Sequence, residues 1–334
     1  MAKVVSFGEV MLRLTCPGYT RIIQTDSFDI SYAGSEANVA VSLALFGHES
    51  AFVTKFPEND VGQAAINELR RYGVDTARIV RGGPRLGVYY IEKGASQRGG
   101  KVIYDRAGSS IALAKAEEFD WDSIFQGADW FHFSGITPAL GGELPEACLS
   151  AVKAAKKRGM TVSCDLNYRA KLWSKEEAGR VMNSLMPYVD VCIANDAEVR
   201  AMFGILPEDA SDERAASISI ARQMAERFGC KTVAVTLLNE YSSSGNTWSG
   251  MLYQDGEAYF ARTYDVHVVD RVGCGDSFGA GIINALLRGW DCRKAIEFGV
   301  AAGAMKMTIE YDFCLAGEDE ILAVMSSEGA ALVR

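Results

Sequence analysis

The stretch Asp270-Arg271-Val272-Gly273-Cys274-Gly275-Asp276-Ser277-Phe278-Gly279-Ala280-Gly281 joins a strand-like run to a helical pattern. Residues 264–269 alternate as a strand does, and apolar residues recur at helical spacing from Phe278 to Leu287. The glycines therefore fall at a helix N-terminus, where free N–H groups and the positive end of the helix dipole attract phosphate. Asp276 adds a carboxylate among these donors. The sequence predicts a phosphate cradle that contains a base.

A simpler interpretation of the Gly-x-Gly-Asp pattern is a tight turn with a capping aspartate. The surrounding residues favour the cradle, because they resemble the signature Asp-Thr-x-Gly-Ala-Gly-Asp-x-Phe-x-Gly-Gly of the ribokinase-like (PfkB) carbohydrate kinases. By this resemblance Asp276 is the catalytic base, and the N–H groups of Gly273, Cys274 and Gly275 form the anion hole. Arg271 replaces the usual threonine, and a thiol beside a transferred phosphoryl group is unusual.

Composition excludes several other classes of protein. The 334 residues are 49% hydrophobic, enough for one large α/β domain or two smaller ones. The net charge of -9 is scattered, so neither a nucleic acid nor a membrane surface is an expected partner. No apolar run approaches the ~20 residues that span a bilayer, so we expect a cytoplasmic protein. Eight widely spaced cysteines and three histidines make a disulfide framework or a zinc site improbable.

Short apolar runs alternate with helical segments along the chain, which predicts an α/β fold with a mostly parallel sheet covered on both faces. The resemblance implies one ribokinase-like three-layer α/β/α domain over residues 1–334. It also implies a small β lid formed by about 13–33 and 86–108, with a hairpin loop at 94–100. Because lid edges need a cover, we expect a homodimer or higher homo-oligomer through the lid.

The segment 32–40 carries a second motif, Tyr-Ala-Gly-Ser-Glu-Ala-Asn-Val-Ala. Helix capping alone would explain it. Beside the Asp276 motif it resembles the family signature Gly-Gly-x-x-x-Asn-x-Ala, which holds sugar hydroxyls. Ala33 replaces the first glycine and has less backbone freedom. The resemblance therefore assigns substrate binding to Gly34 and Asn38.

A third motif, Asp-x-Asn-x-Arg-x-x-Leu-Trp, begins at Asp165 directly after a predicted strand. Open α/β sheets bind ligands at that end of their strands. Local turn hydrogen bonds and a surface ion pair are an equally good explanation of these residues. The pattern resembles kinases for ketoses and keto-deoxy sugar acids, and the guanidinium of Arg169 suits a carboxylate.

The identity of the substrate depends on residues of the predicted lid. Tyr89, Tyr104 and Arg106 align with residues that 2-keto-3-deoxygluconate kinases use to bind the acid, and the segment around Ile136 resembles theirs. Aromatic residues that alternate with apolar ones usually mark only a half-buried strand. Two guanidinium groups, of Arg106 and Arg169, would offset the desolvation of a substrate carboxylate. An acidic sugar is therefore favoured over a neutral ketose.

The nucleotide side carries a weaker signal. Asn195 and Glu198 resemble the family's Asn-x-x-Glu, in which the glutamate holds Mg²⁺ through water, although a helix cap competes with this interpretation. Thr236 is expected near the phosphates of ATP. The glycine that usually follows is absent, and residues 237–245 are interpreted as a longer polar loop, which leaves the adenine pocket undefined.

The resemblance also implies a site for a monovalent cation such as K⁺. Asp270 would contribute to it, together with the segments 301–308 and 310–313. Neither a requirement for potassium nor a role for the thiol of Cys274 follows from the sequence.

The resemblance runs from Gly8 to about Ala316 and implies ATP-dependent, Mg²⁺-dependent phosphorylation of a primary hydroxyl of a sugar acid. The expected substrate is 2-keto-3-deoxygluconate, the product its 6-phosphate, and the expected activity that of a 2-dehydro-3-deoxygluconokinase. A kinase for fructose or another neutral sugar is the nearest alternative. A noncatalytic ribokinase-like binding protein is a third, which the retention of Asp276 disfavours.

Overall fold

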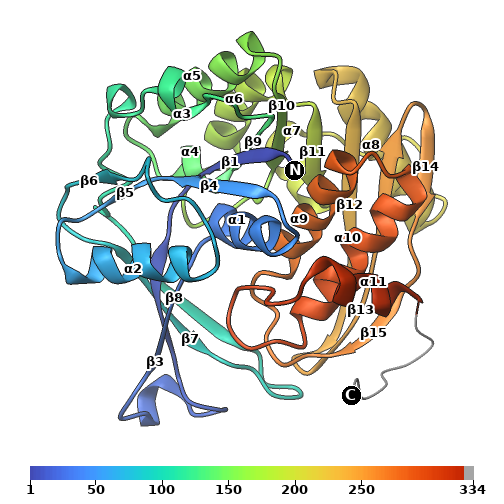
Figure 1. The fold of residues 1–334 in the computed structure, drawn as a ribbon. Helices are drawn as coiled ribbons and strands as arrows, with labels where there is room; N and C mark the ends of the chain where they lie inside the picture. Colours follow the sequence, from blue (N-terminus) through green and yellow to red (C-terminus); the bar gives the residue numbers. More distant parts are fainter. Residues whose placement is uncertain (327–334) are drawn as a thin grey trace.

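The computed structural model describes residues 1–326 and is built around a nine-stranded sheet between two layers of helices (Figure 1). Its six parallel strands are, in spatial order, β4 (Glu49–Val53), β1 (Lys3–Phe7), β9 (Trp130–Ser134), β10 (Thr161–Asp165), β11 (Val191–Ala194) and β12 (Thr232–Ser242). The antiparallel strands β13 (Gly245–Gln254), β14 (Glu257–Phe260) and β15 (Tyr264–His267) complete it beside β12. The predicted mostly parallel sheet is confirmed.

Apolar side chains project from both faces of the parallel strands, because successive residues of a strand point to opposite faces. Val5 and Phe7 pack into one hydrophobic cluster, whereas Val4 packs into another on the opposite face. The first face is covered by α3 (Trp121–Ile124), α4 (Ile136–Ala139), α5 (Leu144–Lys157), α6 (Lys175–Leu185), α7 (Asp196–Phe203) and α8 (Glu213–Phe228). The second is covered by α1 (Ser35–Leu45), α9 (Cys274–Leu287), α10 (Cys292–Lys306) and α11 (Glu318–Ser326). The fold is therefore three-layered.

A separate four-stranded sheet, in the order β3-β2-β7-β8, comes from the two segments predicted as a lid. Its strands are β2 (Met11–Thr15), β3 (Asp29–Ala33), β7 (Gly87–Glu92) and β8 (Lys101–Asp105). Figure 1 shows it projecting below the main sheet. Ile30 on edge strand β3 and Ile103 on edge strand β8 are exposed. Assembly through these edges stays a prediction.

The remaining short elements connect these parts. The helix α2 (Asp60–Arg71) packs against α1 in a third hydrophobic cluster. The connecting strands are β5 (Lys55–Phe56) and β6 (Val80–Arg81), and the 3-10 helices are η1 (Ile22–Gln24), η2 (Ala116–Glu118) and η3 (Met186–Tyr188).

The prediction of a polar loop over 237–245 is wrong, because most of this segment is strand. Strand β12 continues to Ser242 and forms a hairpin with β13, in which Leu238 pairs with Trp248 and Glu240 with Asn246. Partner β13 supplies the backbone hydrogen bonds that an exposed polar strand needs, and the sequence of 237–245 alone does not show that partner.

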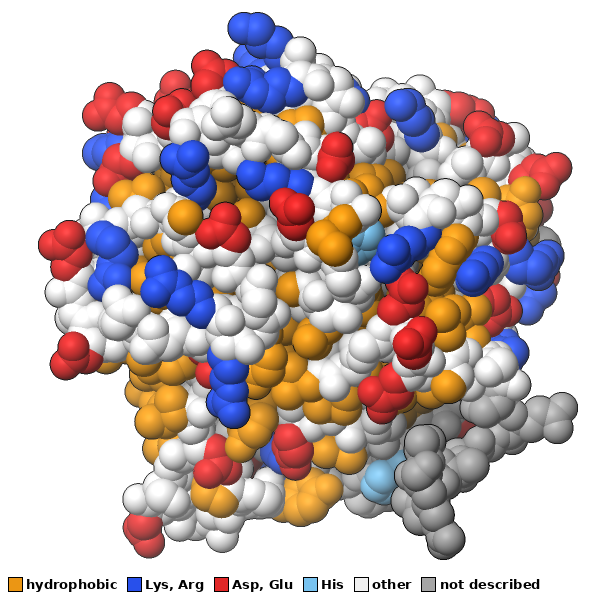
Figure 2. All heavy atoms as spheres, in the orientation of Figure 1, with side chains coloured by type: hydrophobic (Ala, Val, Ile, Leu, Met, Phe, Trp, Pro, Cys, Tyr) orange, Lys and Arg blue, Asp and Glu red, His pale blue; other side chains and the backbone are white. Residues whose placement is uncertain are grey.

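Charged side chains of both signs are interspersed over the face shown in Figure 2. This face offers no large basic patch of the kind that binds nucleic acid. Within residues 1–326, none of the helices combines the length and the apolar composition that a membrane span requires.

Candidate active site

A cavity of about 540 Å³ lies between the carboxyl ends of the parallel strands and the small sheet. Its size suits a small-molecule site, and its position is where open α/β sheets bind ligands. The predicted site residues that line it are Gly34, Asn38, Tyr89, Tyr104, Arg106, Ile136, Arg169, Asn195, Glu198, Thr236, Gly273, Cys274, Gly275 and Asp276. Asp270 is the predicted site residue outside this lining. The structure thus brings together residues from four separate motifs, whose individual roles stay predictions.

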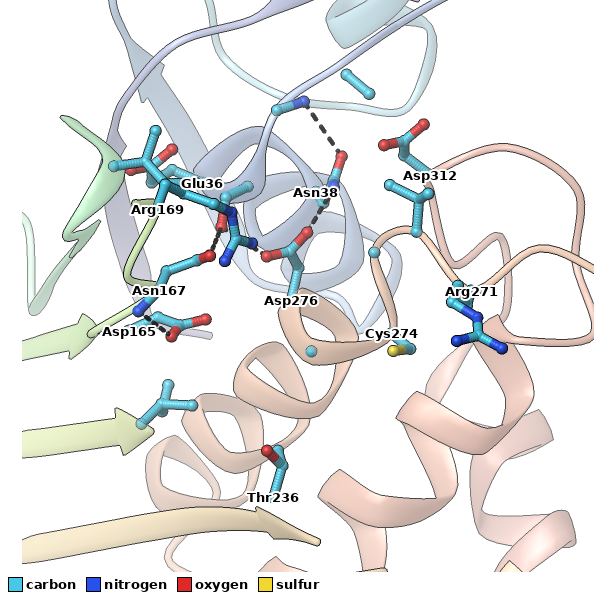
Figure 3. Close-up of a pocket in the computed structure, with 18 of the residues that line it drawn as sticks. Glu36, Asn38, Asp165, Asn167, Arg169, Thr236, Arg271, Cys274, Asp276 and Asp312 are labelled. Carbon is cyan, nitrogen blue, oxygen red and sulfur yellow. Dashed lines mark hydrogen bonds between the residues drawn. The ribbon is translucent and has the colours of Figure 1, made fainter. Parts of the chain in front are cut away.

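The carboxylate of Asp276 lies where the N-termini of α1 and α9 meet (Figure 3). Its Oδ1 accepts a 2.6 Å hydrogen bond from Ser35 Oγ, and its Oδ2 accepts one of 2.6 Å from Asn38 Nδ2. Both donors belong to α1, 241 and 238 residues away in the chain. The first and second motifs therefore form one unit.

Two glycines allow these helix ends to approach their neighbours. Gly273 caps α9 with φ of 88°, a left-handed conformation, and a Cβ there would lie 2.1 Å from the carbonyl oxygen of Asp312. A Cβ on Gly34, the cap of α1, would lie 1.8 Å from the carbonyl oxygen of Glu9. Any larger residue at either position would push the backbone out of place.

Burial raises the pKa of Asp276 above its usual value. The hydrogen bonds from Ser35 and Asn38 act in the opposite direction because they favour the ionised form, as does the nearby charge of Arg169. The net result is a raised pKa. A carboxylate of this kind holds a proton more strongly than an exposed aspartate does, which suits a general base.

Residues 273–275 form the cap and the first residues of α9, and they line the cavity. The N–H group of Cys274 donates to the carbonyl oxygen of Arg271 at 3.2 Å, so in this conformation it serves the turn. Burial raises the pKa of the Cys274 thiol to about 11, so the sulfur stays protonated at neutral pH. Arg271, which replaces the family's threonine, forms an ion pair with Glu240 on β12.

The segment after β10 reaches the same site. Asn167, with φ of 41°, donates from Nδ2 to Ser35 Oγ at 3.0 Å and from its backbone N–H to Asp165 Oδ1 at 3.1 Å. Its Oδ1 is buried without a hydrogen-bond partner among the described residues, and the residue lines the cavity. A buried acceptor of this kind usually awaits a ligand donor or water. Arg169 is exposed and its guanidinium points toward Asp276 (Figure 3).

The lid residues have protein partners already. Arg106 forms an ion pair with Glu9 Oε2, and Ser109 Oγ donates to Glu9 Oε1 at 2.7 Å. Tyr89 donates to the carboxylate of Asp312 at 2.9 Å. The rings of Tyr89 and Tyr104 stack with centroids 6.0 Å apart. The positive charge of Arg106 is therefore balanced within the protein, which its sequence position did not indicate.

Asn195 and Glu198 form a capping box at the start of α7, as the simpler interpretation of these residues predicted. Glu198 also lines the cavity with Asp165, and burial raises the pKa of both carboxyl groups. The charges of Glu198 and Asp276 raise the pKa of Asp165 further. Within residues 1–326 no three His, Cys, Asp or Glu side chains are grouped as direct metal ligands. Two crowded carboxylates nevertheless fit a Mg²⁺ ion held through its water molecules.

Several residues of the site were not singled out by the sequence. Ser35 and Asn167 lie inside quoted motifs, and their hydroxyl and amide groups were the available signal. Glu36 is buried and accepts hydrogen bonds from Ser134 and Thr137 at 2.6 Å. Glu9 and Asp312 are identified by their partners in the structure, which are Arg106 and Ser109 for Glu9, and Arg13 and Tyr89 for Asp312.

The chain is similar in sequence and in fold to known carbohydrate kinases. The family model of pfkB family carbohydrate kinases matches residues 1–311. A solved 2-dehydro-3-deoxygluconokinase of Thermotoga maritima superimposes with a TM-score of 0.95 and 50% identity, over 98% of each chain. A putative 2-keto-3-deoxygluconate kinase of Enterococcus faecalis gives a TM-score of 0.94 at 27% identity, over 100% of this chain and 99% of that one. A 2-dehydro-3-deoxygalactonokinase of Haloferax volcanii is 34% identical over 100% of this chain and 99% of its own length.

Proposed function

Because the chain belongs to the pfkB family of carbohydrate kinases, we propose that it phosphorylates a primary hydroxyl of a 2-keto-3-deoxy sugar acid with ATP. The proposed substrate is 2-keto-3-deoxygluconate, and the proposed product is its 6-phosphate. The observation that carries the proposal is the half-buried carboxylate of Asp276, which faces the cavity at the N-terminus of α9. The 50% identity to the Thermotoga maritima kinase supports the choice of substrate.

In the proposed reaction Asp276 accepts the proton of the substrate hydroxyl as its oxygen attacks the γ-phosphorus. The new O–P bond forms while the bond between the γ-phosphorus and the bridging oxygen of ADP breaks. Ser35 and Asn38 hold the carboxylate in line, since each donates to one of its oxygens. Backbone N–H groups of Gly273 and Gly275, at the positive end of α9, would stabilise charge on the equatorial oxygens, and that of Cys274 would join them on leaving the carbonyl oxygen of Arg271. A Mg²⁺ ion near Asp165 and Glu198 would screen the phosphate charges when bound.

For the substrate end we propose contacts from Gly34, Asn38, Tyr89, Tyr104, Arg106, Ile136 and Arg169, all of which line the cavity. Arg169 is the guanidinium better placed to gain a new anionic partner, because Arg106 is already paired with Glu9. For the nucleotide we propose Asn195, Glu198 and Thr236.

The pairing of Arg106 with Glu9 favours a second candidate, a kinase for fructose or another neutral sugar, because it reduces the positive charge available to an acid. The 2-keto-3-deoxy acid with the galacto configuration is a closer variant of the first candidate, given the Haloferax volcanii relative. The rates of ATP consumption with each of the three sugars distinguish these candidates.

The test is ATP consumption by the purified protein with the gluco acid, the galacto acid and fructose in turn. The Asp276→Asn variant should lower kcat by roughly 10²- to 10⁴-fold with the best substrate. Asp319→Asn, an exposed aspartate outside the cavity, is the matched control and should retain full activity. Equal rates for Asp276→Asn and the unmodified protein would refute the assignment of Asp276 as the base. Failure of the unmodified protein to consume ATP with any sugar would favour a noncatalytic binding protein.

The choice between acid and neutral substrates has its own test. Arg169→Ala should reduce kcat/KM for the acid by about tenfold or more while affecting fructose much less, because a charge-assisted contact is lost only with the acid. Full activity of both Arg106→Ala and Arg169→Ala on the acid would show that the pocket assignment is wrong.

A further inference from the structure

Lys306, the last residue of α10, has a side chain that is 0% exposed. Its Nζ donates to the carbonyl oxygen of Asp270 at 3.0 Å and to that of Ile309 at 3.0 Å. A buried ammonium group is costly unless acceptors surround it. The proposed chemistry of the cavity does not use this lysine directly, so its burial at this position needs another explanation.

The two acceptors belong to the two backbone segments that shape the phosphate cradle. Asp270 begins the turn that leads to Gly273, and its Oδ1 accepts from the N–H group of Val272 at 3.1 Å. Ile309 begins the segment that carries Asp312, whose carbonyl oxygen lies against Gly273. The ammonium of Lys306 therefore joins both segments behind the cradle.

Two buried carboxylates, of Asp270 and Asp312, lie near Lys306 and share Arg13 as their partner. Arg13, also 0% exposed, bridges Asp270 Oδ2 and Asp312 Oδ1 at 2.5 Å each. Burial lowers the pKa of Lys306, and Asp270 and Asp312 act against that effect. Arg13 thus pairs with both carboxylates, whereas the ammonium of Lys306 is held by the backbone carbonyl oxygens beside them.

This arrangement does not fit a separate monovalent cation at Asp270. The carboxylate of Asp270 forms an ion pair with Arg13, and its carbonyl oxygen accepts a hydrogen bond from Lys306. Segment 301–308 contacts Asp270 through the ammonium group of Lys306, and Asp312 in segment 310–313 is linked to Asp270 through Arg13.

We infer that the ammonium of Lys306 is a built-in monovalent cation, which holds the cradle backbone and supplies a fixed positive charge behind it. This inference rests on the proposed phosphoryl transfer at that cradle. Lys306 is a positioning residue, because it acts through the backbone of Asp270 and Ile309. The protein should therefore need no added K⁺.

The first experiment measures ATP-dependent turnover in buffers whose monovalent cation is either tetramethylammonium or K⁺. The unmodified protein should show the same kcat in both. An unmodified protein that is active but depends on K⁺ would overturn the inference and leave the proposed function intact. A protein without turnover in either buffer would instead count against the proposed function.

The second experiment uses Lys306→Met, with Lys294→Met on the same helix as the matched control. Lys306→Met should lower kcat by roughly 10- to 100-fold while the KM for the sugar changes little, since fixed positive charge acts mainly on the transition state. K⁺ or NH₄⁺ should restore part of the activity and raise the Tm of Lys306→Met. Neither cation should change the Tm of the unmodified protein or of Lys294→Met.

Loss of activity that no cation restores, at an unchanged Tm, would overturn the role of cation substitute. If Lys306→Met does not fold, the K⁺ independence of the unmodified protein still decides the question.

Discussion

At the scale of single residues, Ser35 and Asn38 lower the proton affinity of Asp276 against the larger effect of burial, which raises its pKa. Asp276 acts as a base only when ionised, so kcat/KM should fall as the pH drops through its raised pKa. The hydrogen bond from Ser35 favours the ionised form. Ser35→Ala should therefore raise the pKa further and move the acid limb of the profile to higher pH.

The measurement is the pH profile of kcat/KM, with Ser42→Ala as the control. Ser42 is a buried serine on the same helix, its Oγ has no hydrogen-bond partner among the described residues, and it does not line the cavity. Its replacement should leave the profile unchanged. An acid limb of Ser35→Ala that stays in place or moves to lower pH would contradict the assignment of Asp276 as the base.

Residue types in the motifs predicted which side chains reach the cavity, but not which partners they meet. Arg106 pairs with Glu9, 97 residues away, and Lys306 reaches Asp270, 36 residues away. Pairings of this kind depend on how the small sheet and α10 dock, and local pattern carries no information about docking. The first pairing reduces the positive charge that Arg106 offers to a substrate acid. The second places an ammonium group where a monovalent cation was expected.

At the scale of elements, the turn into α9 was predictable because its glycines stand where a strand pattern gives way to a helical one. The extension of β12 was not, since its stability comes from pairing with β13. Whether a segment forms an edge strand or a hairpin depends on the strand it pairs with. Whether a segment forms a capped, periodic helix depends mainly on its own residues.

The same turn gives a prediction about the conformation of α9. Gly273→Ala should destabilise the protein by roughly 1–3 kcal/mol, because alanine at φ of 88° is strained and its Cβ meets the carbonyl oxygen of Asp312. Gly275→Ala is the matched control, since a Cβ there meets open space. Urea unfolding should give Gly275→Ala a free energy of unfolding near that of the unmodified protein. Equal losses in both variants would show that the left-handed cap is not what the turn requires.

At the scale of the whole molecule, Arg13 connects the small sheet to the main sheet. It lies on β2, and its guanidinium reaches Asp270 after β15 and Asp312 after α10. Tyr89 on β7 donates to the same Asp312. The small sheet is therefore attached to the cradle by buried polar contacts. A displacement of the small sheet would change the positions of Asp270 and Asp312.

Removal of this connection should be costly for the entire fold. Arg13→Met leaves two buried carboxylates without their shared partner, which should lower the free energy of unfolding by about 3–5 kcal/mol. Arg85→Met is the control, because its ion pair with Asp105 on the small sheet is exposed and should contribute little. Denaturant unfolding of both variants makes the comparison, and the double variant Arg13→Met with Asp312→Asn should recover part of the loss. Equal small losses for Arg13→Met and Arg85→Met would mean that the two sheets are joined chiefly by other contacts.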